Sequence, residues 1–152
     1  MLALTFGGAL KGVDARTITI EVNIVDGTKS FVVGLPDNAV KESLFRIESA
    51  FKENDFLFPR KKLLVNLAPA DVKKEGSAYD LPIALSILKS SGQMNTERLK
   101  EFMIMGELSL DGSLRPVKGI LPIAIEARKN GLKGMIVPLE NAGEAAIVND
   151  IQ

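Results

Sequence analysis

The order of β-forming and helix-forming segments limits the fold of this chain more than any other feature of the sequence. Residues 2–9 and 17–25 alternate or cluster β-forming side chains, which is typical of strands. Asp26 and Gly27 then form a dipeptide that favours a two-residue hairpin turn, with residues 30–34 as the next strand. Hairpins followed by strand–helix units predict an α+β domain, in which one mixed sheet is covered by helices.

Apolar residues recur at helical spacing in three longer segments. The first helix should run from about residue 38 to 53 and be capped by Asp37 or Asn38. Asp80 is predicted to cap the second helix, and the third should cover residues 120–130. The remaining predicted elements are strands at 63–67, 103–110, 113–117 and 135–137, two turns at 26–27 and 111–112, and a short helix at 142–148.

Composition excludes several classes of chemistry. The chain has no cysteine and no histidine, which removes thiol nucleophiles, Ser-His-Asp triads and almost every zinc or haem site. Nineteen basic residues balance nineteen acidic ones, so contact with nucleic acid would depend on a local basic patch. No apolar run reaches membrane-spanning length. We therefore predict a single cytoplasmic domain over residues 1–152.

Three segments at one order and spacing resemble a known family. Residues 34–43 (GLPDNAVKES), 65–71 (VNLAPAD) and 74–82 (KEGSAYDLP) are similar to the N-terminal domain of the YifB/ComM family of Mg-chelatase-like AAA+ ATPases. That domain looks like the proteolytic domain of Lon, so the resemblance implies a two-layer, ribosomal-protein-type arrangement of mixed sheet and helices. It also implies an AAA+ domain downstream that uses ATP and magnesium, a hexameric ring as homo-oligomer, and DNA branch migration during natural transformation (competence).

The 152 residues themselves lack the signals of a nucleotide or metal site. A phosphate-binding loop would end in Gly-Lys-Ser or Gly-Lys-Thr after a strand, and no such segment is present. Acidic residues are scattered without the clustering of a hard-metal site. We therefore expect no cofactor in this domain and assign ATP and magnesium to the ATPase domain that the resemblance implies.

The Lon resemblance raises the question of a Ser-Lys peptidase, for which Ser77 and Lys118 are the weak candidates. Residues 105–121 (MGELSLDGSLRPVKGIL) resemble the strand, hairpin and helix that carry the lysine of Lon peptidases. In that register the catalytic lysine falls on Leu121, and matching the preceding helix places Ala78 at the nucleophile. Neither dyad member is then present in register, which favours a non-catalytic domain.

Basic residues near aromatic ones are the candidates for contact with DNA or a partner. The densest basic run is at residues 60–62, just after Phe56 and Phe58, and this interleaving suits phosphates and unstacked bases. Acidic neighbours weaken the local field. The candidate residues for this contact are Lys41, Arg46, Arg60, Lys61, Lys62, Lys73, Lys74 and Tyr79, the last as an interface anchor.

Three functional hypotheses follow. The first is a non-catalytic assembly and DNA-facing domain of an ATP-driven motor. The second is a residual Ser-Lys peptidase of Lon type. The third is a peptide-binding or partner-binding module of the ATPase, with no membrane partner in any of the three.

Overall fold

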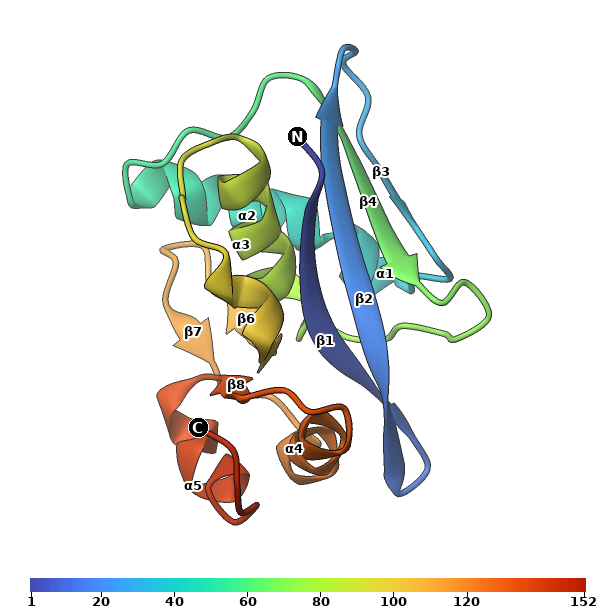
Figure 1. Cartoon of the computed structure of the whole chain (residues 1–152). Helices are drawn as coiled ribbons and strands as arrows, with labels where there is room; N and C mark the ends of the chain where they lie inside the picture. Colours follow the sequence, from blue (N-terminus) through green and yellow to red (C-terminus); the bar gives the residue numbers. More distant parts are fainter.

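A six-stranded mixed sheet organises the molecule, which the computed structural model describes over residues 1–152 (Figure 1). The strand order is β3-β4-β2-β1-β5-β8, and β6 and β7 form a separate two-stranded sheet. The strands are β1 (Ala3–Lys11), β2 (Asp14–Val25), β3 (Phe31–Val33), β4 (Lys62–Ala68), β5 (Phe102–Ile104), β6 (Glu107–Leu108), β7 (Leu114–Arg115) and β8 (Gly134–Ile136). The helices are α1 (Asn38–Lys41), α2 (Ser43–Glu53), α3 (Asp80–Ser90), α4 (Ile120–Lys129) and α5 (Ala142–Ala145), with 3-10 turns η1 (Arg98–Glu101) and η2 (Leu139–Asn141).

The long hairpin of β1 and β2 is the centre of the sheet. Its two strands pair antiparallel from Ala3↔Val22 to Lys11↔Asp14. Alternate residues of a strand point to opposite faces, and here Ile18, Ile20 and Val22 are fully buried while their neighbours stay partly exposed. One face of the sheet therefore carries the main core.

Helix α3 covers that buried face, and α4 packs on the other face near the end of the hairpin. The Thr5 hydroxyl donates to the Pro82 carbonyl at 3.1 Å, which places the start of α3 against β1. Gly8 faces the opposite side of the sheet from Thr5, and a Cβ added there would lie 2.7 Å from Ile123 in α4. The predicted fold class, a mixed sheet covered by helices, is thus confirmed.

The prediction of a hairpin at Asp26-Gly27 is wrong. β4 lies between β2 and β3, pairing antiparallel with β2 and parallel with β3. β4 places Leu63, Val65 and Leu67 in the core, and its pairing with β2 over residues 62–68 outweighs the local preference of the dipeptide. The tight hairpins are the β1–β2 turn and the β6–β7 turn at residues 111–112, the second of which was predicted.

The predicted helices are found, with changes at their starts. The helix expected at 38–53 is divided at Glu42 into α1 and α2, and Asp37 caps it, with Oδ1 accepting from the Val40 amide at 2.8 Å. Asp80 is not the cap of α3: Tyr79 holds that position, and Asp80 is the first helical residue. The predicted strand at 103–110 is divided into β5 and β6, and α5 ends earlier than expected.

None of the helices has the length and apolar character that crossing a membrane requires.

Candidate functional site

The three segments that carry the family resemblance meet around one buried lysine. Lys74 is fully buried, and its ammonium donates to the Gly34 carbonyl at 2.6 Å and to the Pro69 carbonyl. Gly34 adopts φ +104° with its Cα against the Leu67 backbone, where a Cβ would lie 2.1 Å from the carbonyl oxygen. Burial lowers the pKa of Lys74, and the Asp71 carboxylate partly opposes that shift. Lys74 therefore links the segments and is not a surface cation.

A buried ion pair joins α2 to the start of α3. Asp80 is fully buried, and Arg46 donates to it through Nε at 2.7 Å and through Nη2 at 3.0 Å. Asp80 also accepts from the Leu108 amide of β6 at 3.1 Å. The hydrogen bond to Asp80 raises the pKa of Arg46 against the opposing effect of burial. Arg46 is committed to this contact, so the structure does not support its predicted role as a surface cation.

Tyr79 is also internal. Its side chain is 2% exposed, and its hydroxyl donates to the Gly8 carbonyl of β1 at 2.9 Å. Burial is the main cause that raises the pKa of the phenol well above its ordinary value, and the carboxylates of Asp37 and Glu75 add to it. Tyr79 thus anchors the loop before α3 to the sheet, which is a different role from the interface anchor predicted for it.

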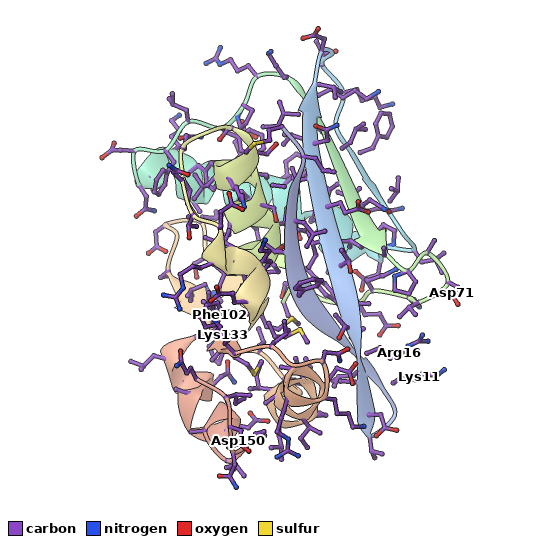
Figure 2. All side chains as sticks on the ribbon, in the orientation of Figure 1. Lys11, Arg16, Asp71, Phe102, Lys133 and Asp150 are labelled. Atoms are coloured by element: carbon purple, nitrogen blue, oxygen red, sulfur yellow. The ribbon has the colours of Figure 1, made fainter.

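Ser77 and Lys118 line one cleft of about 830 Å³ beside this anchor. Ser77 is half-buried, Lys118 is exposed, and no hydrogen bond joins the Ser77 hydroxyl to the Lys118 ammonium. Four cations and four carboxylates line the cleft. They are Lys11, Arg16, Lys73 and Lys118, with Asp37, Asp71, Glu75 and Glu107. Lys11 and Arg16 lie at the hairpin end and Asp71 on the loop after β4, as the labelled side chains of Figure 2 show.

The Lon-register positions lie in the same neighbourhood without the Lon chemistry. Ala78 lines the cleft, and its carbonyl accepts from the Gly106 amide at 2.8 Å. Leu121, in the first turn of α4, is half-buried outside the cleft lining, and its amide donates to Glu144 at 3.0 Å. Of the two positions that the Lon register marks, the cleft therefore contains Ala78 and not Leu121.

A second hollow, here called the groove, lies between α1–α2, residues 28–32 and the loop over residues 55–61. Its volume is about 1330 Å³. Five cations and two carboxylates line it: Lys29, Lys41, Lys52, Arg60 and Lys61, with Glu48 and Asp55. Phenylalanine rings add flat apolar surface, since Phe45 is 73% exposed and Phe56 is 41% exposed. Phe56 lies 5.8 Å from the Phe51 ring of the core, so one edge of the groove is fixed.

The predicted contact residues divide between these surroundings. Lys41, Arg60 and Lys61 are exposed and line the groove together. Lys73 lies at the cleft in an exposed ion pair with Glu75, at 3.2 Å. Lys62 is half-buried on β4, with its ammonium 5.3 Å from the centre of the Phe31 ring.

Sequence reasoning missed three members of the groove, Lys29, Lys52 and Phe45. The signal for Phe45 was present: it falls outside the apolar stripe of its helix, next to Leu44, and is therefore turned to solvent. Lys29 carried no local signal, because it joins the groove only through the parallel pairing of β3 with β4.

No group of three or more acidic, histidine or cysteine side chains is arranged to hold a metal ion.

Comparison with known proteins identifies relatives across almost the whole chain. A family model described as subunit ChlI of Mg-chelatase matches residues 20–141. Competence protein ComM of Haemophilus influenzae is 43% identical over 150 residues, which are 98% of this chain and 29% of ComM. YifB of Escherichia coli is 43% identical over 149 residues, which are 97% of this chain and 29% of YifB. A Lon protease of Azorhizobium caulinodans is 26% identical over 152 residues, covering 95% of this chain and 18% of the protease. The chain thus spans less than a third of the length of these relatives.

Proposed function

The chain belongs to the family of the Mg-chelatase subunit ChlI, with the YifB/ComM proteins among its relatives, and we propose that it is the non-catalytic, DNA-facing assembly domain of a Mg-chelatase-like AAA+ ATPase. ATP and magnesium then belong to the rest of that protein. Its own AAA+ domain and further copies in a hexameric ring are its proposed partners. Branch migration of DNA in the cytoplasm during natural transformation is the proposed process, in keeping with the name of ComM.

The charge and aromatic content of the groove carries this proposal. A nucleic-acid strand presents one phosphate per nucleotide and a flat base beside it, so a binding surface combines cations with exposed rings. The groove has both: five cations against two carboxylates, with Phe45 and Phe56 exposed beside them. Neither the balanced net charge nor the basic run at 60–62 alone provides this combination. The groove is the strongest candidate on the molecule for a polyanion.

The experiment is binding of labelled single-stranded, duplex and branched DNA across a range of salt. We expect the logarithm of the affinity to fall linearly with the logarithm of the salt concentration, because released counterions drive binding. A groove variant, Lys41→Glu/Arg60→Glu/Lys61→Glu, should reduce the slope by about one for each phosphate that it no longer neutralises.

The matched control reverses the same number of charges in the cleft, as Lys11→Glu/Lys73→Glu/Lys118→Glu. It should keep the slope of the unmodified chain. Equal loss of binding in both variants would point to a diffuse charge effect and contradict the groove. Absence of DNA binding in the folded, unmodified chain would remove the DNA-facing part of the proposal.

A second candidate function, a Ser-Lys peptidase, has one observation in its favour. Ser77 and Lys118 line the same cleft, in a chain with recognisable identity to Lon proteases. The missing hydrogen bond and the exposed lysine favour the non-catalytic proposal, since a lysine base requires desolvation to lose its proton near neutral pH. If the cleft instead binds a peptide without cleaving it, the domain would recruit a partner protein to the ATPase.

A further inference from the structure

The groove carries its cations on three separate segments of the chain. Lys41 and Lys52 lie on the helical wall of α1–α2, and Lys29 lies just before β3. Arg60 and Lys61 lie on the loop that forms the third side. Cations on several sides of a hollow can surround one chain of phosphates, whereas a duplex carries its two phosphate chains on the outside of a stiff rod. The arrangement of charge therefore suits a single strand.

Carboxylates near the groove reduce its positive charge without cancelling it. Glu48 and Asp55 belong to the lining, and the fully exposed Asp26 pairs with Lys61 at 3.7 Å. An exposed pair of this kind contributes little, because water and salt screen it, so Lys61 can exchange its carboxylate for a phosphate. The other four cations of the groove form no salt bridge. Their charge remains available to a ligand.

The exposed phenylalanine rings of the groove differ in what already occupies them. The ammonium groups of Lys29 and Lys62 lie 5.5 and 5.3 Å from the centre of the Phe31 ring, so cations already engage that ring. Phe45 and Phe56 have no such cation and are 73% and 41% exposed. A base can stack on these two rings only when it is unpaired, because a duplex hides the faces of its bases.

A glutamine outside the groove fixes the loop that carries Phe56. Gln93, just after α3, accepts from the Leu57 amide through Oε1 at 2.8 Å and donates to the Leu57 carbonyl through Nε2 at 2.7 Å. The Phe56 amide donates to the Phe51 carbonyl at 2.9 Å. Gln93 is itself held, since its amide donates to the Leu88 carbonyl of α3 at 2.9 Å. The loop is thus ordered before a ligand binds, which lowers the entropy cost of binding.

We propose that the groove binds a single strand of DNA, with its phosphates on the cations and its bases stacked on Phe45 and Phe56. Gln93 is a positioning residue for this site, because it acts only through the loop. The inference rests on the DNA part of the proposed function and adds to it the form of DNA that the groove binds. A duplex can use only the phosphate contacts and should bind more weakly than a single strand.

An abasic oligonucleotide separates stacking from charge. It has the same sugar-phosphate chain as an ordinary single strand of equal length and lacks the bases. Fluorescence anisotropy should show the abasic strand binding about fivefold to a hundredfold more weakly, which corresponds to the loss of one stacked base. In Phe45→Ala this difference should shrink. The dependence of affinity on salt should stay the same in that variant, because its phosphate contacts are unchanged.

Substitutions at Gln93 test its positioning role. Gln93→Ala should weaken binding of the single strand by about twofold to tenfold, since the loop must then be ordered on binding. Duplex affinity and the salt dependence should not change. Gln93→Glu keeps the acceptor for the Leu57 amide and loses the donor, so its affinity should fall between the other two. Urea denaturation identifies the temperature at which all three chains are folded and can be compared. An unchanged preference for single strand over duplex in Gln93→Ala would remove this role.

Two results would overturn the single-strand proposal and leave the proposed function in place. Equal affinity for the abasic and the ordinary strand would mean that the groove contacts phosphates alone. A duplex that binds at least as tightly as the single strand of equal length would mean that unpaired bases are not recognised. An unmodified, folded chain that binds none of the probes would instead remove the DNA part of the proposed function, and this inference with it.

Discussion

The cleft and the groove are both open hollows lined by lysine and arginine, and they differ in what accompanies those cations. In the cleft the cations face an equal number of carboxylates, whereas in the groove five cations face two. The cleft is held by buried polar contacts such as that of Tyr79 with Gly8, and the groove instead exposes phenylalanine rings. The cleft therefore has no excess charge for a polyanion, and the groove has an excess of charge beside flat apolar surface.

The two hollows therefore differ in the ligands that their linings suit. Ser77 and Lys118 line the cleft without the hydrogen bond that a Ser-Lys dyad would need. The groove lies beyond the three resemblance segments except at Lys41, on helices and a loop that surround the main core. A fold alone does not assign function. Here the lining of the groove favours binding of a polyanion, and the balanced charge of the cleft does not.

The largest expected effect comes from breaking the ion pair that supports both hollows. Arg46 lies on the helix that walls the groove, and Asp80 starts the helix that follows the cleft loop. Arg46→Met should lower the free energy of unfolding by about 3–5 kcal/mol, because it leaves a buried carboxylate without its cation. Urea denaturation measures this. The double variant Arg46→Met/Asp80→Leu should be less destabilised than the single one, and a loss below about 1 kcal/mol in the single variant would contradict the pair's importance.

A substitution at Phe45 tests whether the groove binds DNA through its exposed rings. Phe45→Ala should weaken binding of single-stranded DNA by about fivefold to a hundredfold, the loss of one base stacked on a ring. Stability should change little because the side chain is 73% exposed. Fluorescence anisotropy checks the affinity, with Val13→Ala, at an exposed apolar position in the hairpin turn, as the control. Equal weakening of duplex and single-stranded DNA would contradict a stacking role.

A substitution at Tyr79, in the cleft lining, should change the free energy of unfolding by a smaller amount, and this change should depend on pH. The folded phenol has its pKa raised by burial, so above pH 10, the ordinary value, the unfolded chain loses its proton while the folded chain keeps it. Its contribution to stability is therefore full below pH 10 and is lost as the pH rises further. Tyr79→Phe should cost about 1 kcal/mol at neutral pH for the hydrogen bond to Gly8 and should flatten the alkaline decline. Identical decline in both proteins, measured by urea denaturation from pH 8 to 11, would contradict this.

The smallest expected effect is at Ser77. If the cleft is non-catalytic, Ser77→Ala and the unmodified chain should show the same background rate on an unfolded protein substrate such as casein. Release of labelled peptides measures the rate, and Lys118→Ala serves as a second variant. A rate that falls in both variants would establish peptidase activity and would make the cleft, and not the groove, the functional site of the domain.

Much of the fold was predictable, because it depends on periodicity and turn chemistry. The hydrophobic spacing located α3 and α4 closely, and Asp111-Gly112 formed the predicted turn. Asp26-Gly27 was misread as a hairpin, because strand order depends on which strand carries the apolar face that completes the core. That strand is β4, which comes thirty-five residues after the turn.

The candidate site was less predictable, since the role of a charged side chain depends on what folds against it. Nothing in the sequence distinguishes Lys41 and Lys61 from Lys74. The first two line the groove, whereas Lys74 is buried and donates hydrogen bonds to two carbonyl groups. Arg46 pairs with a residue 34 positions away, a distance at which no local pattern operates. Phe45 alone carried a readable signal, because it falls out of phase with its helix.

By itself the sequence determined the family, the mixed sheet with its helices, and the exclusion of thiol, histidine and zinc chemistry. The family follows from the resemblance of three segments, and the other two follow from residue types and short-range spacing. The tertiary structure alone decided which cations remain in solvent and which are consumed by buried partners. It also brought Ser77 and Lys118 to one cleft without joining them. Such outcomes depend on contacts between residues far apart in the chain, where desolvation and pairing set whether a charge is free.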